Sequence, residues 1–242
     1  HKDGTRIFHH SGVAAFAEFA VISQNALVKI DASVPFEQAA LFGCAVVTGV
    51  GSVVNTANVR PGQSIVIVGL GGVGLSAMLA AIASGAGRVI AVDINDDKLQ
   101  LARQLGAHQA FNAKAGNCVE SIRAATDGGA HIAIETAGTP MALDMAYKVT
   151  RRGGTTIAAG MPGPEASITL SHLSLVGEER TLKGSYMGSC VPSRDIPRYI
   201  GLFQDGKLPI DRLTSHQIEL DELNEAFDRL VEGSVVRQVL VL

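Results

Sequence analysis

The chain lacks the features that mark secreted and nucleic-acid-binding proteins. It has 242 residues, no tryptophan and three cysteines, Cys44, Cys118 and Cys190. Because these cysteines are few, odd in number and far apart, they do not form a disulfide framework, and we expect a reducing, cytoplasmic location. With 20 Lys and Arg against 23 Asp and Glu, the net charge of −3 gives no basic footprint for nucleic acid.

Small and apolar residues are abundant instead. Hydrophobic residues make up 47% of the chain, and there are 27 glycines, a composition typical of proteins that pack helices onto sheets. Residues 65–87 contain no charged side chain, which on length alone would allow a membrane span. Gly69, Gly71, Gly72 and Gly74 lie where a spanning helix would be weakened. The Val/Ile-rich start of the run changes to an Ala/Leu/Met-rich end, so it is better interpreted as a buried strand followed by a buried helix.

Strand-like and helix-like segments alternate from residue 64 onward. Crossover helices between short apolar strands predict a doubly wound parallel six-stranded sheet, an α/β fold of the Rossmann type. The expected strands are 64–68, 88–93, a short one around 111, 131–135, 155–159 and 181–186, and the expected helices are 72–84, 95–105, 117–125 and 140–152.

The two ends of the chain do not follow this alternation. We assign residues 46–188 to a dinucleotide-binding domain, and residues 1–45 and 189–242 to remnants of a second, mainly β catalytic domain. The second part contains two expected helices, 196–204 and 221–232, and a terminal strand over 236–242. The chain does not begin with Met and enters apolar alternation almost at once, so we expect it to begin partway through a longer protein.

A G-x-G-x-x-G motif over residues 69–74 joins the first strand to the first helix. Gly69 would allow the tight turn, Gly71 the approach of a pyrophosphate to the backbone, and Gly74 the close packing of helix on strand. Gly72 and Val73 complete the loop. The strand before the motif and the helix after it are the context that dinucleotide binding requires.

Asp93 supports the same interpretation. It follows Gly74 by 93 − 74 = 19 residues and ends the second expected strand, where a carboxylate can accept both ribose hydroxyls. Such a carboxylate repels a 2′-phosphate, and neither Ile94 nor Asn95 supplies the arginine that would bind one, so NAD is predicted rather than NADP. Lys98 could reach the ribose from the next helix, or be a solvated helix charge.

Cys44, within Gly43–Gly49 (G-C-A-V-V-T-G), is the one candidate metal ligand. Its spacing alone favours a core thiol over a zinc ligand. The chain has no C-x-x-C, H-x-x-x-H or H-E-x-x-H, and the adjacent His9 and His10 would diverge on a strand. A complete tetrahedral site is therefore not expected from this sequence.

An ordered series of motifs resembles the zinc-dependent medium-chain alcohol dehydrogenases. These are N-A-L-V-K-I-D, G-C-x-x-x-T-G, G-L-G-G-V-G, A-V-D-I-N-x-x-K, T-D-G-G, L-K-G-S-Y-M-G and V-R-Q-V-L, which run through nearly the whole chain. The resemblance implies hydride transfer between an alcohol or aldehyde and NAD at a catalytic Zn²⁺. It implies that Cys44 is the third protein ligand of that zinc.

The same resemblance implies further site residues, and it implies a homodimer, formed through the sixth-strand region, or a higher homo-oligomer. Besides the glycine loop, Asp93 and Lys98, the implied coenzyme contacts are the side chains of Thr48, Val73 and Arg237. Backbone groups of Ala159, Ser185 and Met187 are implied to contact the coenzyme as well. Implied pocket residues are His10, Ser11, Met161 and Tyr186, although each of these could equally be ordinary packing or surface.

Three alternatives remain open. One is a zinc-free quinone or enoyl reductase of the same fold, and another is a non-catalytic NAD-binding fragment. A methyltransferase fits less well, because S-adenosylmethionine has no pyrophosphate for the glycine loop. The family's first third, with the other zinc ligands and the hydroxyl that starts a proton relay, has no counterpart here, so we expect negligible alcohol oxidation by these residues alone.

Overall fold

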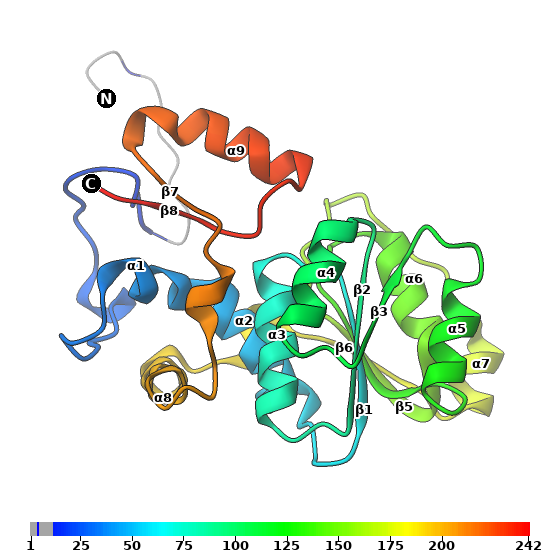
Figure 1. The fold of residues 1–242 in the computed structure, drawn as a ribbon. Helices are drawn as coiled ribbons and strands as arrows, with labels where there is room; N and C mark the ends of the chain where they lie inside the picture. Colours follow the sequence, from blue (N-terminus) through cyan, green and yellow to red (C-terminus); the bar gives the residue numbers. More distant parts are fainter. Residues whose placement is uncertain (1–3, 5–11) are drawn as a thin grey trace.

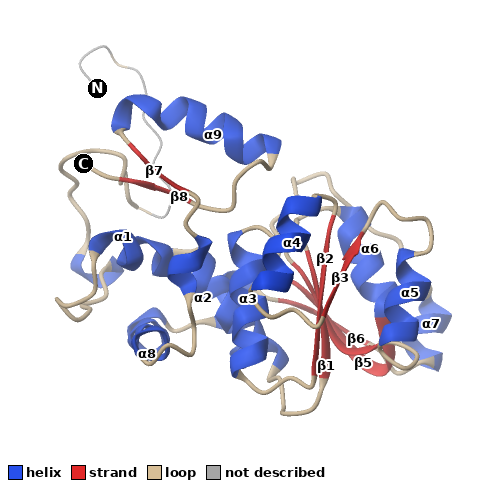
Figure 2. Cartoon of the chain, in the orientation of Figure 1, coloured by secondary structure: helices blue, strands red, loops and turns tan. Residues whose placement is uncertain are grey.

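The computed structural model describes residue 4 and residues 12–242. Its centre is a six-stranded sheet in the order β3-β2-β1-β4-β5-β6, with every neighbouring pair parallel. Figures 1 and 2 show this sheet with helices on both sides. The strands are β1 Ser64–Val68, β2 Arg88–Asp93, β3 Gln109–Asn112, β4 Ala130–Glu135, β5 Thr150–Ala158 and β6 Thr181–Gly184.

The crossover helices separate the core into two layers. They are α3 Gly72–Ala83, α4 Asp96–Gln104, α5 Cys118–Ala125, α6 Pro140–Val149 and α7 His172–Gly177. Along β1, Ile65 and Ile67 point into one apolar cluster, and Val66 and Val68 into the other. A strand buried on both faces is expected for a parallel sheet covered by helices, so the predicted doubly wound fold is confirmed.

The boundaries differ from the expected ones at the fifth and sixth strands. The helix expected over 140–152 ends at Val149, because Thr150 already begins β5 and its Oγ1 bonds the carbonyl of Ala146 (2.8 Å) and Oγ1 of Thr156 (2.8 Å). The sixth strand, β6, ends at Gly184 rather than at residue 186, since the chain turns there into a short 3₁₀ helix, Tyr186–Ser189.

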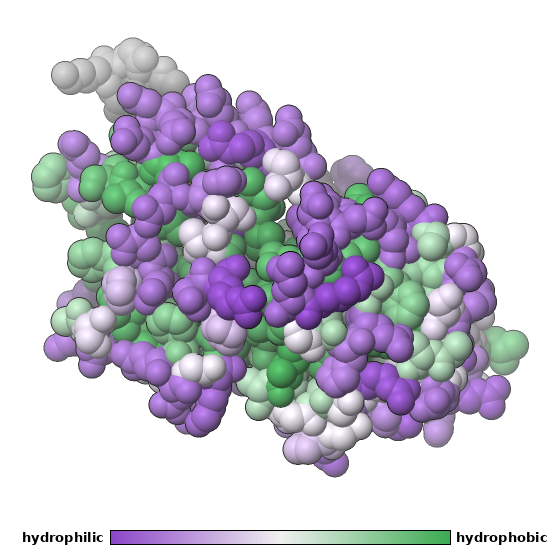
Figure 3. Space-filling view, viewed as in Figure 1, coloured by the Kyte–Doolittle hydropathy of each residue, from purple (hydrophilic) through white to green (hydrophobic). Residues whose placement is uncertain are grey.

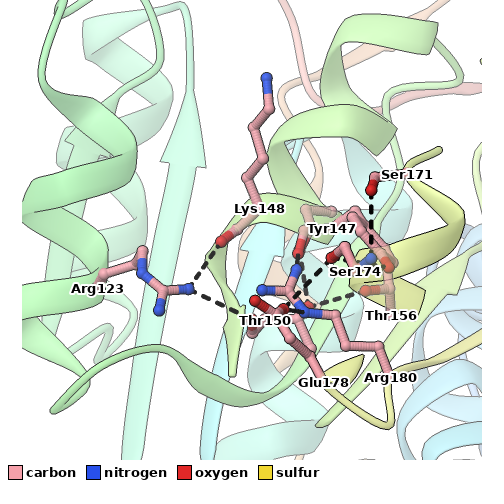
Figure 4. Close-up of polar contacts among 10 residues, drawn as sticks. Arg123, Tyr147, Lys148, Thr150, Thr156, Ser171, Ser174, Glu178 and Arg180 are labelled. Carbon is pink, nitrogen blue, oxygen red and sulfur yellow. Dashed lines mark hydrogen bonds and ion pairs between the residues drawn. The ribbon is translucent and has the colours of Figure 1, made fainter. Parts of the chain in front are cut away.

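A polar cluster fixes the entry into β6 (Figure 4). Arg180, just before the strand, donates to the carbonyl of Tyr147, stacks 4.8 Å from that ring, and pairs with Glu178 at 2.5 Å. Ser174 of α7 donates to the same Glu178 carboxylate (3.3 Å). With 7% of its side chain exposed, Arg180 ties α6, α7 and β6 together.

The remaining described residues form the part of the molecule to the left of the sheet in Figure 1. Its elements are α1 Phe36–Ala39, α2 Ala45–Gly51, α8 Pro192–Gln204, α9 Leu223–Glu232, β7 His216–Ile218 and β8 Gln238–Leu240, with a π-helical turn over Ser52–Ala57 and short 3₁₀ helices at Gln24–Ala26, Ala40–Gly43, Ile210–Leu213 and Leu220–Glu222. The expected terminal strand is shorter than 236–242, and β8 pairs in parallel with β7.

In the ranges 12–45 and 189–242 the structure is mostly helix and loop. Within these ranges the strands that pair are β7 and β8, and the segment around Phe16–Ile30 is not paired into a sheet. Large apolar side chains remain exposed on this segment, including Phe19 and Val21, and Figure 3 shows apolar surface beside α1 and β8. The domain division at residues 46 and 188 stays a prediction.

Taken singly, none of the described helices is long and apolar enough to cross a membrane. One pair of consecutive helical segments, Phe36–Gly43 and Ala45–Ala57, is together long and apolar enough for a membrane span, but the two segments are bent by 54° relative to each other. The uncharged run 65–87 forms most of β1 and all of α3, as the sequence predicts.

Candidate coenzyme and substrate cleft

The glycine loop lies between β1 and the amino end of α3. Gly69 has a φ of +94°, and a Cβ there would be 2.8 Å from the backbone nitrogen of Ala137, so only glycine is suited to this turn. A Cβ on Gly74 would overlap the carbonyl of Gly69, whereas Gly71 has open space beside it. No side chain caps α3 at Gly71, and its first N–H groups are therefore available to an anion.

Arg237 reaches the same loop from the other end of the chain. A Cβ on Gly72 would collide with the Arg237 guanidinium. The Arg237 Nε is buried and has no hydrogen-bond partner within the described part of the chain. Burial lowers the pKa of this guanidinium, and the nearby Cys44 opposes the shift. A half-buried guanidinium whose buried Nε has no partner, beside helical N–H groups, fits a bound pyrophosphate.

Asp93 ends β2 next to the loop, with 9% of its surface exposed. Its Oδ2 accepts from the backbone N–H of Leu70 (2.6 Å) and its Oδ1 from that of Asn95 (2.9 Å). These bonds fix the carboxylate and leave lone pairs for further donors. Lys98 is half-buried on α4, its Nζ 3.6 Å from where a Cβ of Gly233 would be, so it faces the turn after α9.

A second group of expected site residues lines one cleft of about 740 Å³. The cleft lies between the carboxyl end of the sheet and helices α2 and α8. Its walls include Cys44, Thr48, Val73, Ala159, Met161, Ser185, Tyr186 and Met187. These residues come from four separate stretches of the chain, and the fold brings them together.

Backbone groups at the cleft are already partly used. The N–H of Ala159 donates to the carbonyl of Glu135 (2.8 Å), and that of Ser185 to the carbonyl of Ala158 (2.8 Å). Their carbonyl oxygens are therefore the groups with which these two residues can accept a donor from a ligand. Met187 follows with a positive φ of 45°.

Glu135 forms part of the support under the cleft. It is 2% exposed, and burial raises the pKa of its carboxyl, while backbone N–H groups, including that of Gly138 (2.5 Å to Oε1), act against this shift. These bonds hold together the turn after β4 and the turn after β5. Glu135 is thus a structural group, and it is absent from the cleft's lining.

Cys44 is exposed at the cleft, and all three cysteines are free. In residue 4 and residues 12–242, no three His, Cys, Asp or Glu side chains gather as a metal site would require. The described residues therefore supply at most one ligand of a tetrahedral zinc site, and they do not by themselves fit the metal. His10 and Ser11 lie outside the described residues.

Several lining residues were not anticipated from the sequence. Thr136, whose Oγ1 donates to the carbonyl of Gly69 (2.7 Å), faces the cleft directly after β4. Its place after a parallel strand, like that of Asp93, is a signal that could have found it. Phe42, Ile196 and Ile200 form apolar wall, but nothing in their local pattern distinguishes them from core residues.

The sheet order, the glycine loop and the cleft at the carboxyl edge define a Rossmann-type α/β protein. A family model described as "Zinc-binding dehydrogenase" matches residues 72–205, more than half of the chain. The chain belongs to this family, that of the zinc-dependent medium-chain alcohol dehydrogenases.

Individual relatives agree with the family. The chain is 38% identical over 231 residues to geraniol dehydrogenase of Castellaniella defragrans, covering 95% of this chain and 62% of the relative. It is 35% identical to alcohol dehydrogenase-like 7 of Arabidopsis thaliana, covering 98% and 62%. The chain thus spans about 62% of the length of these curated relatives.

Solved structures show the same fold. Benzyl alcohol dehydrogenase from Acinetobacter calcoaceticus superposes with a TM-score of 0.91 at 35% identity, over 94% of this chain and 63% of that one. An alcohol dehydrogenase zinc-binding domain protein from Burkholderia ambifaria gives 0.91 at 34% identity, over 96% and 62%.

Proposed function

We propose that the protein is an oxidoreductase that transfers a hydride between an alcohol or aldehyde and NAD, and that this chain carries its coenzyme site. The observation that supports this most is the buried, unpartnered Arg237 Nε against Gly72 at the amino end of α3. A dinucleotide pyrophosphate would give that cation its missing partner.

The rest of the coenzyme can be placed from there by the order of groups along the carboxyl edge. Asp93 accepts the adenosine ribose hydroxyls, and its charge disfavours a 2′-phosphate. Across the loop, Val73 packs on the nicotinamide, while the carbonyls of Ala159 and Ser185 and the backbone of Met187 hold its carboxamide. Thr48 lies on the coenzyme side of the cleft. Bound NAD supplies a carbon that accepts the hydride, and the protein orients the two reactants.

The proposed substrate is an uncharged, apolar alcohol or aldehyde. None of the cleft-lining side chains, among the residues with described positions, is charged, and Phe42, Ile196 and Ile200 form one wall. Burial of a charged substrate there would leave its charge unpaired. Two relatives are named for geraniol and benzyl alcohol, and both are apolar alcohols. These names favour an alcohol dehydrogenase over a quinone or enoyl reductase.

Zinc remains a proposal for the whole protein. Cys44 stands at the cleft wall, where a thiolate could be one ligand, and the other ligands would have to come from outside the described residues.

We also propose a cytoplasmic homodimer. The strand β6 is at the edge of the sheet, where it pairs with β5, and Thr181 and Lys183 are exposed on it. An exposed edge strand is a template for pairing with a second copy.

The test of the coenzyme site is calorimetry of the 242-residue chain with NAD, NADP and ADP-ribose. We expect NAD and ADP-ribose to bind and NADP to bind more weakly. Equal or tighter binding of NADP would contradict the proposed role of Asp93, and binding of none of the three would contradict the coenzyme site as a whole.

A further inference from the structure

The segment that follows β6 has an unusual backbone. Three consecutive residues, Met187, Gly188 and Ser189, have φ values of 45°, 66° and 49°. Left-handed conformations are uncommon for residues other than glycine, and each costs energy that surrounding contacts must offset. Met187 lines the cleft, so what holds this segment also sets the shape of the cleft.

Asn55, in the π-helical turn Ser52–Ala57, contacts the centre of the segment. Its Nδ2 donates to the carbonyl of Gly188 (3.2 Å) and lies near Oδ2 of Asp195 (3.4 Å) and the hydroxyl of Tyr199 (3.3 Å). Asn55 is half-buried and does not line the cleft. It therefore acts on the cleft through Gly188.

The next residue, Thr56, contacts both ends of the same segment. Its Oγ1 is 2.8 Å from Oγ of Ser185 and 2.9 Å from Oγ of Ser189. Two neighbouring side chains of one turn thus bind the beginning, the middle and the end of the segment. π-Helical turns are rare and are frequently found at functional sites.

The partners of Asn55 are themselves fixed. Asp195 is 1% exposed, accepts from the N–H of Val191 (2.8 Å), and receives two bonds from Arg194 (2.6 and 2.8 Å). Gly188 packs on α2, where a Cβ would lie 2.7 Å from Cα of Gly51. The segment has no room to relax toward α2, so the hydrogen bond from Asn55 decides the orientation of the peptide after Gly188.

We propose that Asn55 is a positioning residue for the nicotinamide end of the coenzyme. By holding Gly188, it keeps the backbone of Ser185 and Met187 turned toward the cleft, where the carboxamide is bound. This inference rests on the proposed function. The amide N–H groups are essential, because a carboxylate at position 55 would face both the carbonyl of Gly188 and the carboxylate of Asp195.

The experiment compares two ligands that differ in the nicotinamide. NADH carries the reduced ring, which also reports its surroundings by fluorescence, and ADP-ribose lacks the ring. Binding of both is measured for the wild-type 242-residue chain, Asn55→Asp, Asn55→Ala and Asn58→Asp. The last is a matched control, because Asn58 ends the same turn, is exposed, and undergoes the same change of charge.

We expect Asn55→Asp to weaken NADH binding about tenfold, from lost hydrogen bonds, and to reduce the fluorescence change of the bound ring. ADP-ribose binding should stay within about twofold, since its contacts are elsewhere. Asn55→Ala should show the same pattern more weakly, which keeps the test valid if the aspartate variant does not fold. Asn58→Asp should change neither ligand.

Equal losses of NADH and ADP-ribose binding in both Asn55 variants, or no loss in either, would overturn the role of Asn55 while leaving the proposed function intact. If the wild-type chain binds neither ligand, the proposed function fails and this inference fails with it.

Discussion

The Nε of Arg237 lies against Gly72 so closely that the loop has no space for a Cβ. This contact joins the turn before β8 to the amino end of α3. It places a guanidinium whose Nε has no partner in the described part of the chain where helical N–H groups converge. Any change at either residue should therefore act on a bound pyrophosphate.

Arg237→Ala is expected to weaken NAD binding by about 1.5–3 kcal/mol, or roughly 10- to 150-fold, because charge-assisted bonds to the pyrophosphate are lost. Gly72→Ala should act in the same direction by displacing the guanidinium. Calorimetry of NAD binding at two salt concentrations checks both variants. Arg152→Ala is the control, because Arg152 is exposed and lies near the amino end of β5, away from the carboxyl edge of the sheet. Unchanged affinity for NAD in both variants would mean that Arg237 does not bind the pyrophosphate.

Asp93→Asn should reduce the preference for NAD over NADP. The substitution removes the charge that repels a 2′-phosphate and weakens acceptance of the ribose hydroxyls, at a cost of about 1.5–3 kcal/mol in NAD binding. Asp97→Asn, in the exposed first turn of α4, is the matched control. The measurement is the ratio of the dissociation constants for NAD and NADP. An unchanged ratio would mean that Asp93 only accepts hydrogen bonds from the backbone of Leu70 and Asn95.

Cys44→Ala should abolish zinc binding in protein purified from its native source, with loss of nearly all turnover and unchanged NAD affinity, because three protein ligands define such a site and the nucleotide is bound elsewhere. Metal analysis together with calorimetry checks this. Full zinc content and full activity in the variant would make Cys44 an ordinary cleft thiol.

Low pH should weaken the stabilising interactions of the Asp195 carboxylate. Hydrogen bonds from Arg194 lower the pKa of its carboxyl to about 2, below the unfolded value of about 3.9. Its stabilising contribution is therefore complete above about pH 4 and is lost as the pH falls toward about 2. Thermal midpoints of wild type and Asp195→Asn should differ most above pH 4 and converge below it, whereas a constant difference would contradict this linkage.

Lys183→Cys should form an intermolecular disulfide under mild oxidation if two β6 edges pair across a two-fold axis. Lys207→Cys, exposed after α8, and the wild-type chain serve as controls for reaction through surface cysteines. Non-reducing electrophoresis and light scattering provide the measurement. A monomer at all concentrations would exclude the proposed dimer.

Short-range sequence patterns were enough to predict the first strand, the glycine loop and the carboxylate beside it. The apolar run 65–68, the glycine motif over 69–74 and the spacing of Asp93 from it predicted β1, the loop and the end of β2. Each of these patterns depends on neighbours within about two dozen residues. Resemblance to a family added Cys44, Thr48 and the backbone groups of Ala159 and Ser185, and the structure gathers these four at one cleft.

Other features were decided by the tertiary structure alone. Nothing near Asn55 in the sequence indicates that its amide reaches Gly188, and nothing near Arg237 indicates that its guanidinium rests on Gly72. These contacts exist because β6 and β8 bring distant segments back onto α2 and α3. Local patterns reflect the period of a helix or strand, whereas such contacts depend on how whole elements pack, and that information is spread over the entire chain.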